Sequence, residues 1–142
     1  MLGLLVISHG RLAEELVQAA TTIVGPVEAL EAVSIGWDDD VSRARARIEA
    51  AVGRVGGDEG VLILTDMFGG TPTNIALSLL DEDRVEVVTG VNLPMLIKFT
   101  NLREQIGLQD VSRRIAEQGR RAIHVASELL EGAGEEASGE EE

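Results

Sequence analysis

Cysteine is absent from this 142-residue chain, and so is every kind of site that depends on it. Without cysteine the protein has no disulfides, no thiol nucleophile and no Cys-based metal site, which fits a reducing cytoplasm. Aromatic residues are also scarce, at 2 % of a chain that is 44 % hydrophobic. The core must therefore be built from leucine, valine, isoleucine and alanine, which is typical of helices packed on a parallel sheet.

Basic residues are few, because 12 lysines and arginines face 25 aspartates and glutamates, for a formal net charge of −13. Lys98 is the single lysine. Nucleic acid and anionic membranes would repel such an acidic protein, whereas a basic protein would be attracted to it. We therefore expect no nucleic-acid partner and no direct membrane binding.

Long hydrophobic runs are missing as well. The apolar run over 2–7 is too short for a signal peptide or a membrane span, and no basic segment precedes it. We expect a cytoplasmic protein. The length suits one domain, which we place at residues 1–131. Residues 132–142 contain only Gly, Ala, Ser and Glu, and are predicted to form an acidic, disordered tail.

Apolar segments with strand character alternate with segments of helical spacing. Strands are predicted over 2–8, 29–35, 61–64 and 84–88. Helices are predicted over 12–23, 41–55, 71–80 and 95–101, with a last one from Asp110 to about Leu129. Asp38–Asp40, Thr71 and Asp110 are expected to cap the helices that follow them. The pattern predicts an α/β fold, doubly wound, with a mostly parallel sheet of four main strands and helices on both faces.

Polar residues follow two of the buried strands. One segment is Ser8-His9-Gly10, and the other runs from Thr65 to Pro72. In an open α/β sheet, ligands bind beyond the carboxyl ends of the strands, near the point where the strand order switches. Parallel strands end at the same edge of the sheet, so we expect His9 and Asp66 to meet there.

A histidine beside a carboxylate has a specific use. The carboxylate accepts the imidazole N–H, fixes the tautomer and leaves the other ring nitrogen as a nucleophile. The Gly69-Gly70 amides can form an anion nest, and a helix beginning at Thr71-Pro72 offers further N–H groups, with the Thr71 hydroxyl as an additional donor. This combination needs no metal and no cofactor, and it predicts a phosphohistidine carrier.

Each of these residues also has an ordinary interpretation when taken alone. His9 could be a hydrogen-bonding residue at a strand end, Asp66 could form a turn, and the segment 69–72 could be an ordinary turn and helix cap. Their joint placement favours function. Met67 and Phe68 beside the site fit either core residues or an exposed rim on which a partner docks, and both readings stay open. Trp37 is interpreted as a packing or interface residue. His124 is interpreted as a surface residue of the last helix, and Asp38–Asp40 as caps rather than metal ligands.

Three segments together resemble a known family. They are Ser8-His9-Gly10, the sequence LTDMFGGTPTN over 64–74, and GVNLPML over 90–96. In this order and context they resemble the enzyme IIA (EIIA) domain of the mannose family of the phosphotransferase system. The resemblance covers about residues 1–130. The first segment is weak by itself, and the other two are specific.

The resemblance implies roles for individual residues. His9 matches the histidine that carries the phosphoryl group, Asp66 the aspartate that hydrogen-bonds it, and Thr71 a hydroxyl residue beside the phosphate. It also implies a homodimer that takes phosphate from the phosphocarrier protein HPr and passes it to a IIB component. Membranes would be involved only indirectly, through transporter subunits. Met67-Phe68 stands where transport enzymes often have tryptophan after the aspartate, and no IIB domain follows, so transport and purely regulatory roles both stay open.

Four alternatives remain. The phosphocarrier subunit of a dihydroxyacetone kinase shares the fold, but in such subunits the first segment resembles Ser-His-Ser, with serine where this chain has Gly10. A metal-dependent chelatase would need further ligands, and only His124 remains. A receiver domain would need an acidic pair in place of Ser8-His9, and a lysine after the last strand rather than Lys98 in a helix. A non-catalytic binding module would not be phosphorylated at all.

Overall fold

Four parallel strands form the central sheet of the computed structural model, which describes residues 1–132. The strands are β1 (Gly3–His9), β2 (Leu30–Ile35), β3 (Val61–Thr65) and β4 (Val85–Thr89). Their order is β2-β1-β3-β4. The chain therefore places β2 on one side of β1, and then β3 and β4 on the other side of β1. The strand order thus switches between β1 and β3, and the predicted parallel α/β sheet is confirmed.

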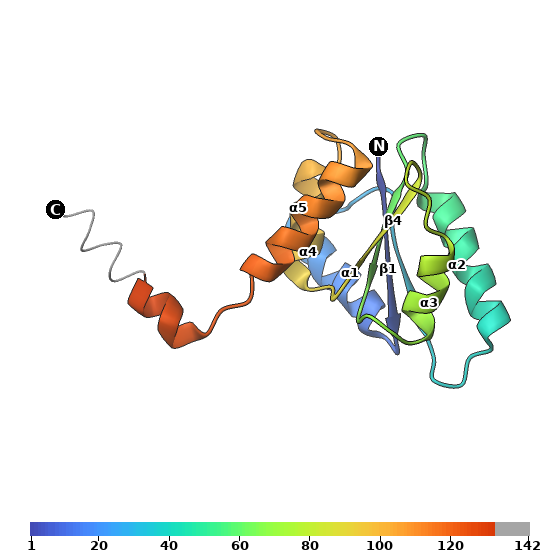
Figure 1. The fold of residues 1–142 in the computed structure, drawn as a ribbon, viewed down its shortest axis with the longest axis horizontal. Coiled ribbons are helices and arrows are strands. Elements are labelled where there is room, and N and C mark those ends of the chain that lie inside the picture. The colour runs from blue at the N-terminus through green and yellow to red at the C-terminus, as the bar shows by residue number, and fades with distance from the viewer. Residues whose placement is uncertain (133–142) are drawn as a thin grey trace.

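Five helices cover the two faces of this sheet (Figure 1). They are α1 (Leu12–Val24), α2 (Val41–Val55), α3 (Thr71–Ser78), α4 (Leu93–Leu102) and α5 (Leu108–Arg121). Helices α1, α4 and α5 pack on one face, whereas α2 and α3 pack on the other. The doubly wound arrangement explains why the sequence reads as alternating strands and helices.

The central strand β1 contributes to two separate cores. Leu4 and Val6 pack with α1, α4 and α5, whereas Leu5 and Ile7 pack with α2 and α3. All four side chains are fully buried. Successive side chains of a strand point to opposite faces, so a strand covered on both sides reads as one continuous apolar run.

The register brings three strand ends together. His9, the last residue of β1, pairs with Ile35, the last residue of β2. On the other side of β1, Ile7 pairs with Thr65, the last residue of β3. The Gly10 amide donates to the Ile35 carbonyl at 2.8 Å, which holds the chain beyond β1 against the end of β2. The segments after β1, β2 and β3 therefore share one edge of the sheet.

Several predicted helix ends need correction. Gly70, not Thr71, is the N-cap of α3, because glycine adopts the positive φ of 87° found there. Helix α5 starts at Leu108 after an extended Gly107, which leaves Asp110 in the first turn, where its charge suits the helix dipole. The helix expected to reach Leu129 ends instead at Arg121, and a separate helical segment at 126–132 follows a non-helical stretch at 123–125.

The region before α2 also differs from expectation. Asp40 is the N-cap of α2, but its side chain makes no capping hydrogen bond. The neighbouring Asp39 carboxylate accepts from the Gly36 amide instead, at 2.7 Å. The predicted acidic tail lies, apart from Gly132, outside the described residues. Within residues 1–132, no helix combines the length and apolarity required to cross a membrane.

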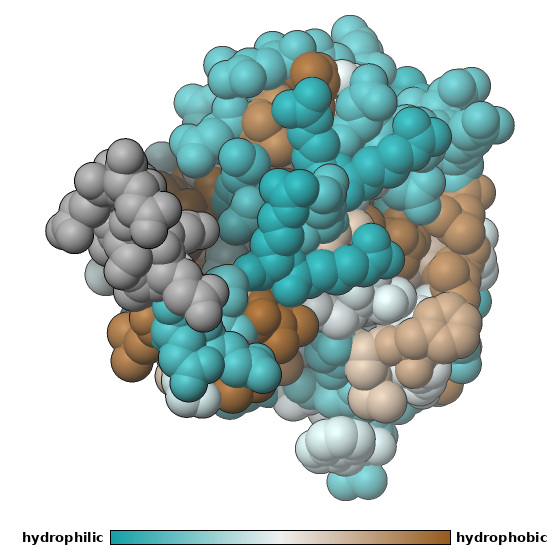
Figure 2. All heavy atoms as spheres, turned by 60° about the vertical axis from the view of Figure 1, so that its left-hand side comes forward, coloured by the Kyte–Doolittle hydropathy of each residue, from teal (hydrophilic) through white to brown (hydrophobic). Residues whose placement is uncertain are grey.

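The face that carries α5 is mostly hydrophilic, with hydrophobic side chains in separate patches (Figure 2). Two exposed arginines of α5 pair with acids of the same helix, Arg113 with Asp110 and Arg121 with Glu117. Ion pairs this exposed contribute little to stability. This face therefore presents charged side chains to the solvent, and the apolar core lies between α5 and the sheet.

Candidate functional site

His9 and Asp66 meet at the carboxyl edge of the sheet, as their positions at two strand ends predict. Asp66 Oδ2 lies 2.8 Å from His9 Nδ1 and also accepts the His9 backbone N–H at 2.9 Å. Asp66 Oδ1 accepts the Met67 amide at 2.9 Å. The carboxylate is held by two backbone donors and in turn fixes the imidazole ring. A carboxylate at Nδ1 favours the tautomer with the proton on Nδ1 and the lone pair on Nε2.

Both side chains are partly sheltered from water. The side chain of His9 is 19 % exposed and that of Asp66 is 12 % exposed. Shelter strengthens the hydrogen bond between them, whereas the remaining exposure leaves the ring accessible to a partner. The arrangement suits a histidine that reacts with another macromolecule rather than with a small molecule enclosed in a pocket.

The glycine turn faces the free nitrogen of His9. Gly69 and Gly70 have φ angles of 96° and 87°, a region that residues with a side chain rarely adopt. A Cβ atom on Gly70 would lie 2.9 Å from His9 Cε1 and 3.0 Å from His9 Nε2. Only a glycine allows the backbone to come this close to the imidazole. The predicted juxtaposition of His9 with this turn is present.

Helix α3 begins directly after that turn. Its first intrahelical hydrogen bond runs from the Asn74 amide to the Gly70 carbonyl at 3.0 Å. The backbone amides before Asn74 have no carbonyl acceptor within the helix. Together with the helix dipole, these free amides favour the binding of an anion. Thr71 is half-buried at the first helical position, beside the turn that contacts His9. The structure therefore places Gly69, Gly70 and Thr71 at the same edge as His9.

Thr73 supports this loop, a role that its place in the 64–74 segment does not reveal by itself. Its hydroxyl is buried and hydrogen-bonds both to Thr65 Oγ1, at 2.9 Å, and to the Met67 carbonyl, at 2.5 Å. These contacts tie the first turn of α3 to the end of β3. On the other side of the site, Ser8 Oγ accepts the Ala13 amide at 2.7 Å and so anchors the start of α1.

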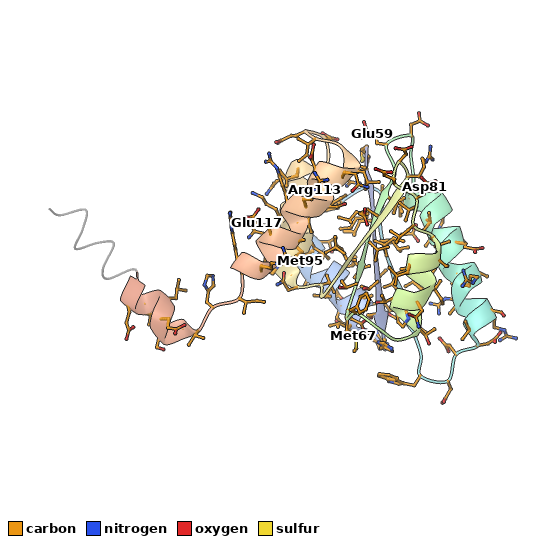
Figure 3. The ribbon with its side chains drawn as sticks, viewed as in Figure 1. Glu59, Met67, Asp81, Met95, Arg113 and Glu117 are labelled. Atoms are coloured by element: carbon orange, nitrogen blue, oxygen red, sulfur yellow. The ribbon has the colours of Figure 1, made fainter. Side chains whose placement is uncertain are left out.

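Met67 and Phe68 are surface residues. They are 55 % and 75 % exposed, which removes the interpretation of either as a core residue. Figure 3 shows Met67 at the end of the sheet to which β1 points, which is the edge that carries His9. Two large apolar side chains exposed next to a sheltered histidine are typical of a surface that a partner covers.

Trp37 belongs to the site, whereas the sequence suggested a packing or interface role. Its ring stacks on the His9 imidazole with centroids 4.9 Å apart and an angle of 17° between the planes. It comes two residues after the end of β2, the strand that pairs with β1 at His9. Once β2 is known to lie beside β1, the position of Trp37 just after β2 predicts that it lies near His9.

The third recognisable segment, 90–96, has a structural role. The Asn92 side chain accepts the Met95 amide at 3.3 Å and thereby caps α4. Its amide group donates to the Gly119 carbonyl of α5 at 3.0 Å. Gly119 lies so close to Met95 that a Cβ atom there would clash with the Met95 sulfur. The segment holds α4 and α5 together.

The remaining candidate residues, His124 and Asp39, form no described hydrogen bond with His9 or Asp66. His124 is exposed in the stretch 123–125, beyond α5 rather than inside it. Asp39 belongs to the turn after β2, where it binds the Gly36 amide and pairs with Arg47 at 3.7 Å. Within residues 1–132, no three His, Asp or Glu side chains are grouped so that they could hold a metal ion.

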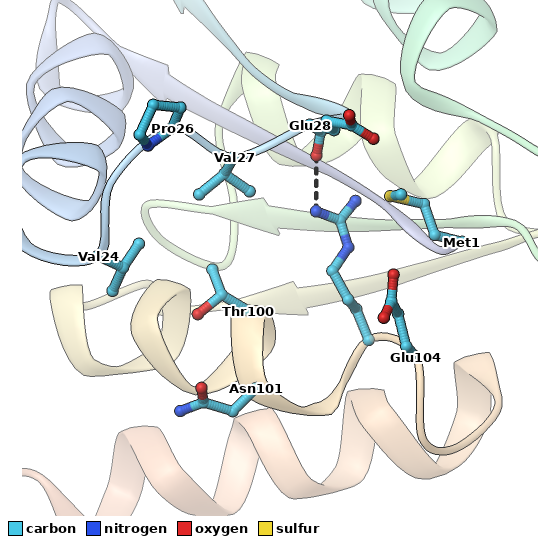
Figure 4. Close-up of a pocket in the computed structure, with 9 residues that line it drawn as sticks. Met1, Val24, Pro26, Val27, Glu28, Thr100, Asn101 and Glu104 are labelled. Carbon is cyan, nitrogen blue, oxygen red and sulfur yellow. Dashed lines mark hydrogen bonds between the residues drawn. The ribbon is translucent and has the colours of Figure 1, made fainter.

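A hollow of about 510 Å³ lies at the opposite, amino-terminal edge of the sheet (Figure 4). It contains Arg103, whose buried guanidinium donates to the main-chain oxygens of Leu2 and Glu28. Burial lowers the pKa of this guanidinium, but an arginine stays charged throughout the neutral range. The donors of Arg103 are thus occupied by main-chain oxygens, which gives this residue a structural role.

Comparison with known proteins identifies what the chain resembles. The family model EIIA-man, described as "PTS system fructose IIA component", matches residues 3–116. The "PTS system fructose-specific EIIA component" of Bacillus subtilis (strain 168) is 31 % identical over 132 residues, which cover 92 % of this chain and 90 % of that protein. The "PTS system mannose-specific EIIAB component" of Escherichia coli (strain K12) is 33 % identical over 103 residues, but they cover 68 % of this chain and 30 % of that protein.

Solved structures agree with the sequence matches. The mannose/sorbose-specific IIA subunit of the phosphotransferase system from Enterococcus faecalis superposes with a TM-score of 0.77 at 29 % identity, covering 87 % of this chain and 92 % of that one. A PTS IIA protein associated with the fucose utilization operon of Streptococcus pneumoniae gives a TM-score of 0.81 at 25 % identity, covering 91 % and 96 %. The likeness therefore extends over nearly the whole described chain.

Proposed function

This chain belongs to the EIIA-man family of phosphotransferase-system IIA components, and on that premise we propose that it carries the phosphoryl group on Nε2 of His9. One observation carries the proposal. Asp66 Oδ2 binds both the backbone N–H and the Nδ1 atom of His9, so the ring is fixed with Nε2 as the free nitrogen. That nitrogen faces the Gly69-Gly70 turn and the start of α3, where an anion is favoured.

The transfer step needs little from the protein beyond positioning. The Nε2 lone pair attacks the phosphorus of a donor phosphohistidine, and the donor N–P bond breaks with its electron pair returning to the donor ring. His9 keeps its proton on Nδ1 and becomes positively charged, and Asp66 compensates this charge. Charge on the transferred phosphoryl oxygens is stabilised by the amides of Gly69, Gly70 and Thr71, with the Thr71 hydroxyl as a further donor.

The donor in this proposal is the phosphocarrier protein HPr, and the acceptor is a IIB component. Family membership supports both, as does the exposed position of Met67 and Phe68, on which each partner would dock in turn. The net charge of −13 favours partners with a basic surface around their own reactive residue. The protein would thus act as an intermediate carrier of phosphate between two proteins.

We also propose that the protein forms a homodimer. Its C-terminal segment leaves the body of the molecule (Figure 1) and exposes four large apolar side chains: Ile123, Val125, Leu129 and Leu130. Ile123 and Leu130 are 76 % and 73 % exposed. Apolar residues concentrated on a projecting segment are typical of a surface that another chain covers.

The test of the carrier role is phosphorylation of the purified protein by phosphoenolpyruvate, enzyme I and HPr, followed by intact mass at neutral pH. We expect the wild type to gain one acid-labile phosphoryl group and His9→Ala to gain none. His124→Ala is the matched control, because it removes the chain's other histidine, and it should be phosphorylated like the wild type. A His9→Ala protein that still takes up phosphate would disprove the assignment.

Asp66→Asn tests the supporting carboxylate. The amide oxygen can still accept a backbone N–H, but the side chain no longer carries the charge that compensates the phosphorylated ring. We expect phosphate transfer to slow by about 10- to 100-fold, the range that loss of a carboxylate partner costs a metal-bound histidine. Rapid-quench kinetics with phospho-HPr measure this rate. An unchanged rate would show that Asp66 does not assist His9.

A further inference from the structure

Trp37 combines high exposure with a specific contact. Its side chain is 81 % exposed, yet its ring lies 4.9 Å from the His9 ring and nearly parallel to it. Exposing a large aromatic side chain forgoes the stabilisation that its burial would give. The contact with the imidazole is therefore the feature that needs an explanation.

The turn that presents Trp37 is well supported. Gly36 and Asp39, on either side of it, are joined twice: the Gly36 amide donates to Asp39 Oδ2 at 2.7 Å, and the Asp39 amide donates to the Gly36 carbonyl at 3.2 Å. Arg47 of α2 lies 3.7 Å from Asp39 Oδ2 and donates to the Ser34 carbonyl at 3.1 Å. Trp37 is thus held over His9 by a turn anchored both to β2 and to α2.

The stack restrains a motion that Asp66 leaves free. The hydrogen bond between Nδ1 and Asp66 Oδ2 fixes one atom of the imidazole, but the ring plane can still tilt by small rotations about the Cα–Cβ and Cβ–Cγ bonds of His9. An indole lying against the face of the ring opposes this rotation. It keeps the plane of the imidazole constant, and with it the direction of Nε2 toward Gly70. Small displacements of a reacting atom strongly reduce transfer rates.

The stack also acts on charge. A neutral imidazole gains modestly from an aromatic neighbour, whereas a positively charged ring is attracted to the electron-rich face of an indole. In the carrier reaction, His9 is neutral before transfer and positively charged afterwards. An indole on its face stabilises the second state more than the first, which favours acceptance of the phosphoryl group.

We propose that Trp37 is a positioning residue for His9, which aims Nε2 at the Gly69-Gly70 turn and stabilises the charged ring once it is phosphorylated. The effect of Trp37 on phosphoryl transfer rests on the proposed carrier role of His9. The stacking of Trp37 on the His9 ring does not depend on that role. Two measurements separate the two claims.

The first measurement is the NMR spectrum of the histidine ring protons in the unphosphorylated protein. An indole ring current shifts the signals of protons stacked against it, so we expect Trp37→Leu to move the His9 signals toward ordinary positions. His124, the only other histidine, is an internal control whose signals should not move. His9 signals that stay in place in Trp37→Leu would overturn the proposal, whether or not the protein carries phosphate.

The second measurement is the rate of transfer from phospho-HPr, analysed as a limiting rate and a half-saturating concentration. We expect Trp37→Leu to lower the limiting rate about tenfold, which corresponds to ~1.4 kcal/mol and lies within the range of an aromatic–cation contact. Trp37→Phe should retain most of the rate, because a phenyl ring can still stack. Wild-type limiting rates in both variants, with only the half-saturating concentration raised, would make Trp37 a docking residue and overturn the proposal.

Discussion

At the scale of single residues, Gly70 carries the most specific constraint in the site. Both Gly69 and Gly70 have positive φ angles, so an alanine at either position strains the backbone. They differ in what a new methyl group would meet. At Gly70 it would lie 3.0 Å from His9 Nε2, whereas at Gly69 it would meet nothing within 4 Å. The two positions therefore separate backbone strain from interference with the histidine.

We expect Gly70→Ala and Gly69→Ala to lose similar stability, about 1–3 kcal/mol each, because both force an alanine into a glycine conformation. Gly70→Ala should in addition slow phosphorylation, on the order of 100-fold more than Gly69→Ala does, because only its methyl group displaces Nε2. Urea unfolding measures the first quantity, and rapid-quench transfer from phospho-HPr measures the second. Equal transfer rates in the two variants would show that the approach of Gly70 to His9 has no role in the reaction.

The pair of His9 and Asp66 could be predicted from the sequence, because each residue follows a buried strand and parallel strands end at the same edge. Trp37 could not be assigned in the same way. Its place depends on the β2-β1-β3-β4 order and on the turn closed by Asp39, neither of which leaves a periodic signal. The roles proposed for Gly69, Gly70 and Thr71 in binding phosphate remain predictions.

At the scale of secondary-structure elements, Arg103 joins the end of α4 to the starts of β1 and β2. Its guanidinium donates to the Leu2 carbonyl at 3.0 Å and to the Glu28 carbonyl at 2.6 Å, and it lies 5.1 Å from the centroid of the Phe99 ring. A lysine cannot reproduce several directed donors from one planar group. The contacts of Arg103 hold the edge of the sheet opposite to the candidate site.

We expect Arg103→Lys to lower the free energy of unfolding by about 2 kcal/mol, the scale of losing hydrogen bonds to a charged donor. Phosphorylation of His9 should continue at the wild-type rate below the unfolding temperature. The control is Arg113→Lys, in a side chain that is 78 % exposed, where the change should stay within ~0.5 kcal/mol. Urea unfolding measures both. Equal stability of the two variants would mean that the Arg103 contacts do not hold the elements together.

The ends of the elements were harder to predict than their existence. Helical spacing of apolar residues continues past Arg121 to Leu129, yet α5 ends at Arg121. Periodicity records which residues can share a helix face, but not whether a surface is present for that face to cover. Ile115 is fully buried against the sheet, whereas Ile123 and Leu129 have no such surface among the described residues and are exposed.

At the scale of the whole molecule, the two ends of the sheet have different roles: the carboxyl edge carries the candidate site, and the opposite edge supports the fold. His9, Asp66, Trp37 and the glycine turn occupy the carboxyl edge, while Arg103 and its carbonyl partners occupy the other. The buried core residues of the described chain lie between Leu2 and Ile115, and the last named element ends at Arg121. The segment 122–132 contributes exposed apolar side chains and none of the buried core residues.

A chain that ends at Arg121 is therefore expected to fold and to accept phosphate on His9 at the wild-type rate, because it keeps every core and site residue. It should elute as a monomer, since it lacks the four exposed apolar side chains proposed to form the dimer. A chain that ends at Gly132 keeps those side chains and removes only residues 133–142, so it is the matched control and should remain a dimer. Light scattering coupled to size-exclusion chromatography distinguishes these states. A dimer of the shorter chain would place the interface on the body of the protein, and a monomeric full-length chain would refute the dimer altogether.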